Sequence, residues 1–237
     1  MPNSPKRIVA ITTVIWEGRA SRARTIIGKY LFGFNRNGRP PHPRSEIISI
    51  FTHQTPENGI SRDWGRDVNI PVFRTIHEAL TLGTDKLAVD GVLLIAEHGD
   101  YPFNDKEQKM YPRFELFLEI ADTFRRTGQS VPVFNDKHLS FTWTNAKRMY
   151  DISKEVHFPF MAGSSVTVNY RESDVEFPWG GRATHGVVVG PGPIDSYGFH
   201  MLETVQSLIE RRAGGEKGVE AVQCLKGDAI WQFLDST

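Results

Sequence analysis

Apolar and polar positions alternate along the first two thirds of the chain in two distinct periods. Continuous apolar runs, typical of buried strands, occupy residues 7–16, 46–52, 69–74, 90–100, 131–140 and 158–165. Between them, apolar residues recur at helical spacing over 23–34, 75–83, 113–130 and 144–156. Apolar strands that alternate with amphipathic helices indicate parallel strands covered on both faces. The pattern therefore predicts a doubly wound, mostly parallel Rossmann-like α/β domain over residues 5–165.

The pattern changes after residue 165. The segment 166–237 reads as loop and strand, with strands expected at 186–190 and 218–227 and a helix at 196–212. We interpret it as a short, apparently truncated α+β C-terminal unit. Apolar strands in so short a unit would leave an exposed sheet edge, which predicts a homodimer that pairs this region.

Composition narrows the class of partner. The 28 Lys and Arg balance 28 Asp and Glu, so no nucleic-acid partner is expected. No apolar run approaches the roughly 18 residues of a membrane span, and the N-terminus lacks a signal-peptide pattern. Cys224 is the single cysteine, which excludes an intrachain disulfide. We expect a cytoplasmic protein that acts on a small-molecule substrate.

Polar side chains gather where the predicted strands end. In an open α/β sheet, ligands bind outside the carboxyl ends of the strands. His53 follows the strand at 46–52, and Asn135 belongs to the polar tail of the strand at 131–140. The full set at these ends is His53, Glu97, His98, Asp100, Asn135, Asp136, Lys137 and His138. We predict that these tails form one site, with His53, Glu97 and Asn135 contacting the substrate.

Two short motifs resemble a known family. The strand–"NDKHL"–helix unit resembles the strand–E-K-P–helix unit of the Gfo/Idh/MocA oxidoreductases, and Lys137 falls on that motif's lysine. The stretch "YGFHMLE" resembles the family's D-x-G-x-H-x-x-D helix, with Gly198, His200 and Glu203 on matching positions. The resemblance implies a Rossmann-like domain and nicotinamide-dependent oxidation of a sugar or inositol hydroxyl, with Lys137 and His200 in proton transfer.

The sequence departs from that family at the cofactor motifs. The first turn reads "TTVIWEGRASRA", with Val14, Ile15 and Trp16 in place of the glycines that let a backbone approach pyrophosphate. The strand at 46–52 is followed by "HQT" rather than by an acid for the ribose. These departures argue against NAD(P) as a cofactor and predict that it is not bound tightly.

Histidines and carboxylates offer a different chemistry. A mixed set of these side chains suits Zn²⁺, Mn²⁺ or Fe²⁺, and His200 and Glu203 share one helix face at three-residue spacing. The predicted ligands are His98, Asp100, His138, His200 and Glu203. The leading hypothesis is a metal-dependent hydrolase of a small polar ester or phosphoester, in which Asp136, Lys137 and His200 are catalytic. A nicotinamide-dependent sugar oxidoreductase with an unusual cofactor site and a non-catalytic small-molecule-binding protein are the alternatives.

Overall fold

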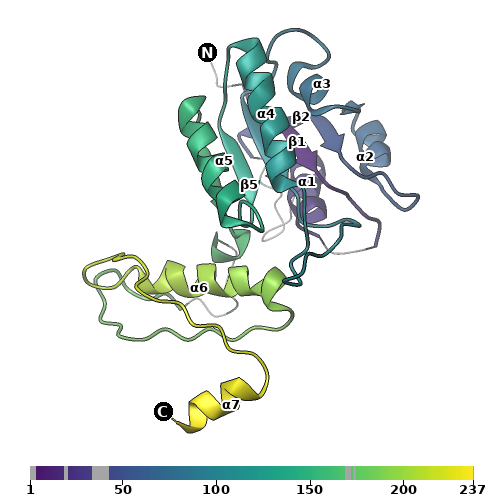
Figure 1. The fold of residues 1–237 in the computed structure, drawn as a ribbon. Helices are drawn as coiled ribbons and strands as arrows, with labels where there is room; N and C mark the ends of the chain where they lie inside the picture. Colours follow the sequence, from purple (N-terminus) through teal and green to yellow (C-terminus); the bar gives the residue numbers. More distant parts are fainter. Residues whose placement is uncertain (1–3, 19–20, 34–42, 169–171, 173–174, 237) are drawn as a thin grey trace.

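The chain folds around one six-stranded sheet (Figure 1). The structure is a computed structural model, and it describes residues 4–18, 21–33, 43–168, 172 and 175–236. All strand pairs are parallel, and the strand order is β3-β2-β1-β4-β5-β6. The strands are β1 (Lys6–Thr12), β2 (Ser45–Thr52), β3 (Val72–Phe73), β4 (Gly91–Ile95), β5 (Val133–Asp136) and β6 (Phe160–Gly163). The predicted doubly wound, parallel Rossmann-like sheet is confirmed.

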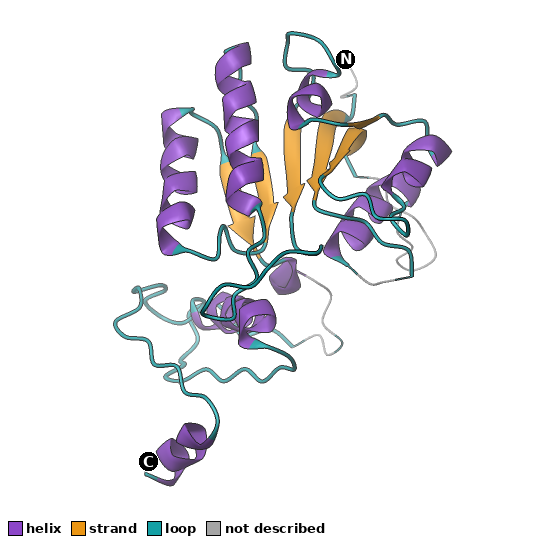
Figure 2. Cartoon of the chain, turned by 45° about the vertical axis from the view of Figure 1, so that its right-hand side comes forward, coloured by secondary structure: helices purple, strands orange, loops and turns teal. Residues whose placement is uncertain are grey.

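Helices cover both faces of this sheet (Figure 2). One face packs against α1 (Arg22–Phe32) and α2 (Ser61–Asp67), in a core that includes Ile27 and Ile50. The other packs against α3 (Ile76–Thr81), α4 (Arg113–Thr127) and α5 (Trp143–Glu155), in a larger core that includes Phe117 and Ile152. Side-chain N-caps fix where three helices begin. The hydroxyls of Ser21, Thr75 and Thr142 accept hydrogen bonds from backbone N–H groups in the first turns of α1, α3 and α5.

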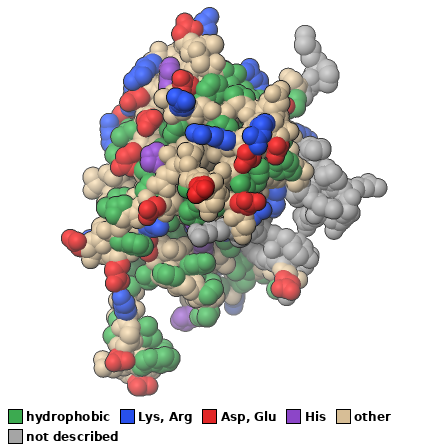
Figure 3. Space-filling view, turned by 90° about the vertical axis from the view of Figure 1, so that its right-hand side faces the viewer, with side chains coloured by type: hydrophobic (Ala, Val, Ile, Leu, Met, Phe, Trp, Pro, Cys, Tyr) green, Lys and Arg blue, Asp and Glu red, His purple; other side chains and the backbone are tan. Residues whose placement is uncertain are grey.

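The region after β6 contains helices and extended segments. It holds the 3-10 turn η1 (Ser165–Val168), the π-turn η2 (Ile194–Gly198), α6 (Phe199–Ile209) and α7 (Asp228–Asp235). α6 lies beneath the carboxyl ends of the strands (Figures 1 and 2). α7 lies near the C-terminus and projects away from the sheet (Figure 1), and apolar side chains are visible on this projecting part (Figure 3).

The strands predicted at 186–190 and 218–227 are wrong. Both segments are loops that pair with no strand among the described residues, and Val187 and Val189 are 87% and 90% exposed. The first segment runs along α6 instead: a Cβ on Gly186 would lie 2.7 Å from Val205. Alternating apolar residues favour a strand, but a strand also needs a hydrogen-bonded neighbour. Homodimerisation through this region stays a prediction. Among the described residues, no helix is long and apolar enough to cross a membrane.

Candidate functional site

The strand order places a switch point between β1 and β4. From β1 the chain winds outward through β2 to β3, and from β4 it winds the other way through β5 to β6. The connections that leave the carboxyl ends of β1 and β4 therefore diverge. A crevice opens at such a point, and it is the usual ligand position in open α/β sheets.

Glu97 lies at this switch point, two residues beyond β4. Its side chain is 3% exposed, and its carboxylate accepts the backbone N–H of Arg22, the first residue of α1. The same carboxylate lies 3.1 Å from Lys137 Nζ and 3.6 Å from His98 Nε2. A buried carboxylate is costly unless it is paired, and this one is paired with both a helix N-terminus and an ammonium group.

The turn after β5 holds Lys137 in a left-handed backbone conformation, with φ 73°. Its backbone N–H donates to the Gly163 carbonyl at 2.9 Å. The Asn135 side-chain amide, which is fully buried, donates to the Lys137 carbonyl at 3.1 Å and to the His138 carbonyl at 3.3 Å. Asn135, predicted to bind substrate, thus braces the turn that aims the 12% exposed Lys137 side chain at Glu97.

His200 reaches the same edge from α6. Ser164 Oγ accepts the Val166 N–H at 3.1 Å and is hydrogen-bonded to His200 Nδ1, while the Ser164 N–H donates to Glu203 Oε2 at 3.1 Å. These contacts fasten α6 to the end of β6. Burial, then the charges of Lys137 and Arg22, lower the pKa of His200 to about 4.

A second pair at this edge joins the buried Arg113 to His138, the residue after Lys137. Arg113, the first residue of α4, is 1% exposed and stacks over the Tyr111 ring at 4.8 Å. Its Nη1 donates to His138 Nε2 at 2.9 Å, since a guanidinium can only donate. Burial, then the Arg113 charge, lower the pKa of His138 to about 3, so the ring is neutral and carries its proton on Nδ1.

The sequence analysis missed Arg113. Its position, between Pro112 and an amphipathic helix, reads as an ordinary first-turn residue. Burial lowers its pKa to about 10, while the charges of Tyr111, Glu97, Asp136 and Asp195 raise it. The buried charge of Asp136 is thus part of what neutralises Arg113. A buried carboxylate such as Asp136 requires a compensating cation, and Arg113 supplies such a charge from the first turn of α4.

Two predicted residues lie apart from the cluster around Glu97, which consists of Glu97, Arg113, Lys137, His138 and His200. The Asp100 backbone forms two hydrogen bonds of 2.9 Å with the Gln54 side chain, and Asp100 itself is exposed. His53 is also exposed and bonds the Tyr101 hydroxyl at 2.8 Å. His98 lies closer to Glu97, and its ring packs at a tilt against the Trp16 ring, with the two ring centroids 5.6 Å apart.

The predicted metal site is not formed. No group of three or more His, Cys, Asp or Glu side chains able to hold a metal exists within the described ranges. The geometry gives the reason for each ligand. His138 Nε2 accepts from Arg113, Asp100 is exposed, and Glu203 accepts from the Ser164 N–H. His98 and His200 pair separately, with Glu97 and Ser164. The prediction of a bound Zn²⁺, Mn²⁺ or Fe²⁺ is therefore wrong.

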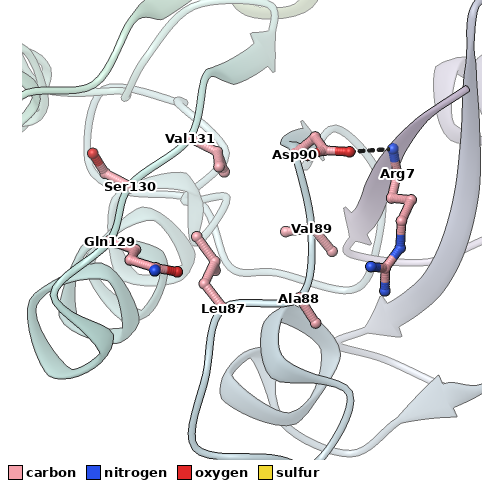
Figure 4. Close-up of a pocket in the computed structure, with 8 residues that line it drawn as sticks. All are labelled: Arg7, Leu87, Ala88, Val89, Asp90, Gln129, Ser130 and Val131. Atoms are coloured by element: carbon pink, nitrogen blue, oxygen red, sulfur yellow. Dashed lines mark hydrogen bonds between the residues drawn. The ribbon is translucent and has the colours of Figure 1, made fainter. Parts of the chain in front are cut away.

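A cavity of about 450 Å³ lies at the opposite, amino edge of the sheet. Figure 4 shows its lining, drawn from the start of β1, the segment before β4 and the segment before β5. Its charged members are Arg7 and Asp90, and the Asp90 carboxylate accepts the Arg7 backbone N–H at 2.8 Å. This cavity shares no residue with the cluster around Glu97.

Comparisons with known proteins identify a set of oxidoreductases. No family model and no curated protein matches the chain. Similar solved structures include a putative dehydrogenase from Bordetella bronchiseptica (16% identity, TM-score 0.43, covering 69% of this chain and 33% of that one). Others are scyllo-inositol dehydrogenase from Lactobacillus casei (10%, 0.44, 69% and 37%) and biliverdin reductase from Synechocystis with biliverdin and NADP⁺ (12%, 0.42, 87% and 57%). The chain thus spans about a third of the length of the first two.

These neighbours bear on three predictions. The resemblance to Gfo/Idh/MocA-type oxidoreductases is confirmed at the level of fold. The leading hypothesis of a metal-dependent hydrolase is wrong, because the described residues form no metal site. The similar structures are named as dehydrogenases and reductases instead. The prediction against nicotinamide cofactors is contradicted by the same set, one member of which holds NADP⁺. That prediction rested on the first turn and on the missing acid after the strand at 46–52, and it gave no weight to the other residues at the carboxyl ends of the strands.

Proposed function

We propose that this chain is the nucleotide-binding part of a nicotinamide-dependent oxidoreductase that acts on a hydroxyl or carbonyl group of a small sugar-like molecule. One observation carries the proposal: the strand order β3-β2-β1-β4-β5-β6 puts a Lys–carboxylate pair at its switch point, and α6 brings a neutral histidine to the same edge of the sheet. Strands in this order bind dinucleotides across the crevice at that point.

The residues at the edge fit such a cofactor. The bulky Val14 and Ile15 are buried, and Ile15 belongs to the core under α1, so their side chains pack in the protein interior. α1 begins after the turn, with Ser21 as its N-cap, and directs backbone N–H groups at the crevice, where a pyrophosphate would be stabilised. One carboxylate, that of Glu97, now accepts the Arg22 N–H and would have to give up this contact.

Lys137 and His200 are the groups proposed to handle the proton. When bound, the nicotinamide would supply the hydride acceptor or donor. Lys137 would exchange a proton with the substrate oxygen at Nζ, since its amine ends at the crevice and is braced by Asn135 and Gly163. His200, neutral and fixed by Ser164, would hold the substrate oxygen through its remaining ring nitrogen. Positioning and proton transfer of this kind contribute about 10²- to 10⁴-fold.

The test is a titration of the purified protein with NADPH and NADH, followed by nucleotide fluorescence, and a screen of sugars and polyols for reduction of NADP⁺. We expect saturable binding, and turnover that falls by about 100-fold in Lys137→Met with binding retained. Lys147→Met, which removes an exposed lysine paired with Asp151 on α5, is the control and should change neither. Absence of nucleotide binding at millimolar concentration would refute the proposal.

A further inference from the structure

The Glu97 carboxylate connects three parts of the sheet edge. It follows β4, it accepts the first free N–H of α1, and it pairs with Lys137 beyond β5 at 3.1 Å. Two of these groups, the helix N-terminus and the ammonium, are the groups that an anionic ligand would use. At 3% and 12% exposure, Glu97 and Lys137 shield one another from solvent.

A ligand phosphate and the Glu97 carboxylate cannot share these contacts. Two like charges in direct contact repel each other, and the repulsion is stronger at a partly buried site than in water. The Arg22 N–H is also a single donor, which already has its acceptor. An anion that enters the crevice must therefore displace Glu97 from α1.

We infer that Glu97 is a displaceable internal anion, which holds Lys137 and the first turn of α1 until a ligand phosphate takes over the helix N-terminus. The inference rests on the proposed function for the identity of that ligand. Displacement has a consequence for Lys137: the ammonium loses its carboxylate partner at the moment when the phosphate arrives. Ligand binding at α1 is thereby coupled to release of the lysine that faces the substrate.

The experiment compares Glu97→Gln with the wild type in two titrations by calorimetry, one with inorganic pyrophosphate and one with NADPH. Glutamine keeps the shape of the side chain and removes its charge. Glu107→Gln is the matched control, because it removes a charge from the same β4–α4 connection at an exposed residue that pairs with Lys226. Glu97→Asp, which keeps the charge on a shorter side chain, replaces Glu97→Gln if circular dichroism shows that the glutamine variant is unfolded.

We expect Glu97→Gln to bind pyrophosphate at least about tenfold more tightly than the wild type, and Glu107→Gln to match the wild type. Glu97→Asp should tighten binding by a smaller factor. Labelling of Lys137 by an amine-reactive reagent, read by mass spectrometry without ligand, should rise several-fold in Glu97→Gln.

The outcomes separate the two proposals. Tighter pyrophosphate binding without any NADPH binding would support the role of Glu97 and refute the nicotinamide function. Tighter binding of both ligands would support both. Pyrophosphate binding that is equal to or weaker than that of the wild type, or that is undetectable in both proteins, would overturn the inference whatever NADPH does.

Discussion

The two edges of the sheet are filled in opposite ways. At the amino edge, Arg7 and Asp90 line a cavity of about 450 Å³ and meet through the Arg7 backbone alone. At the carboxyl edge, Glu97 and Arg113 are buried and Lys137 is 12% exposed, and each contacts a polar partner there. The cavity thus has few charged groups in its lining, and the dense cluster of charged groups lies at the opposite edge of the sheet.

The difference follows from burial. Charged groups taken out of water must be paired, so Glu97 and Lys137 contact one another at the carboxyl edge. The lining of the cavity at the amino edge has only two charged residues, Arg7 and Asp90. In a fold of this kind, the paired buried charges at the switch point are a better indication of the site than the size of a cavity.

The largest expected effect comes from removing the buried cation of the carboxyl edge. Arg113→Leu should lower the free energy of unfolding by about 3 to 5 kcal/mol, because it leaves Asp136 and Glu97 with less compensating charge. Arg125→Leu, on the exposed face of the same helix, should cost less than about 1 kcal/mol. Urea denaturation measures both, and equal losses would contradict the contrast between buried and exposed charge.

The next effect compares the two edges directly. Lys137→Met should cost about 3 kcal/mol, because Glu97 is then buried without its ammonium partner. Much of that loss should return in the double variant Glu97→Gln/Lys137→Met. At the amino edge, Arg7→Met should change stability by about 0.5 kcal/mol or less, since the Asp90 contact uses the Arg7 backbone. A loss at Arg7 as large as that at Lys137 would remove the distinction between the edges.

Acidic pH should lower the free energy of unfolding because of the two histidines at the carboxyl edge, His138 and His200. The pKa values of His138 and His200 are lowered to about 3 and about 4, mainly by burial. The unfolded chain therefore takes up protons below about pH 6.5 that the folded chain refuses, so this stability is present above pH 6.5 and is lost as pH falls toward 4. Between pH 7 and 4.5, His138→Gln should lose about 2 kcal/mol less than the wild type in urea denaturation. Parallel pH profiles would show that His138 already titrates normally.

The smallest effect concerns residues that the structure places outside the cluster. His53→Ala and Asp100→Ala change exposed side chains, and each should alter stability by about 0.5 kcal/mol or less. Pyrophosphate affinity should stay within about twofold of the wild-type value. A tenfold loss of affinity in either variant would extend the site to the β2 side of the switch point.

The sequence predicted the sheet well because its signals are local. Apolar runs such as 90–100 and the helical spacing of 113–130 reflect burial along one strand or one helix face, and β4 and α4 lie there. The predicted strands after residue 185 failed because a strand depends on a neighbour that local pattern does not specify. The helix α2 was not predicted for a different reason: its seven residues are too few to give a clear periodic signal.

The position of the candidate site could be predicted from the sequence, but the contacts between its side chains could not. The tails of β4 and β5 could be expected side by side, and Glu97 and Lys137 do meet there. Sequence patterns do not reveal that Arg113 would take His138 Nε2, which removes that nitrogen from any metal. Nor could they show that Glu97 would reach α1, because that contact joins residues 75 positions apart in the chain.

The central claim is that ligand enters at the carboxyl edge by displacing Glu97. It is tested most directly by amide chemical shifts of ¹⁵N-labelled protein during titration with NADPH. The account predicts the largest shift changes at the Arg22 and Lys137 amides, because Arg22 N–H exchanges its acceptor and Lys137 loses its partner, with little change at Arg7 and Asp90. Saturable shifts at Arg7 and Asp90 with unchanged Arg22 and Lys137 amides would contradict it and would place the ligand in the cavity at the amino edge.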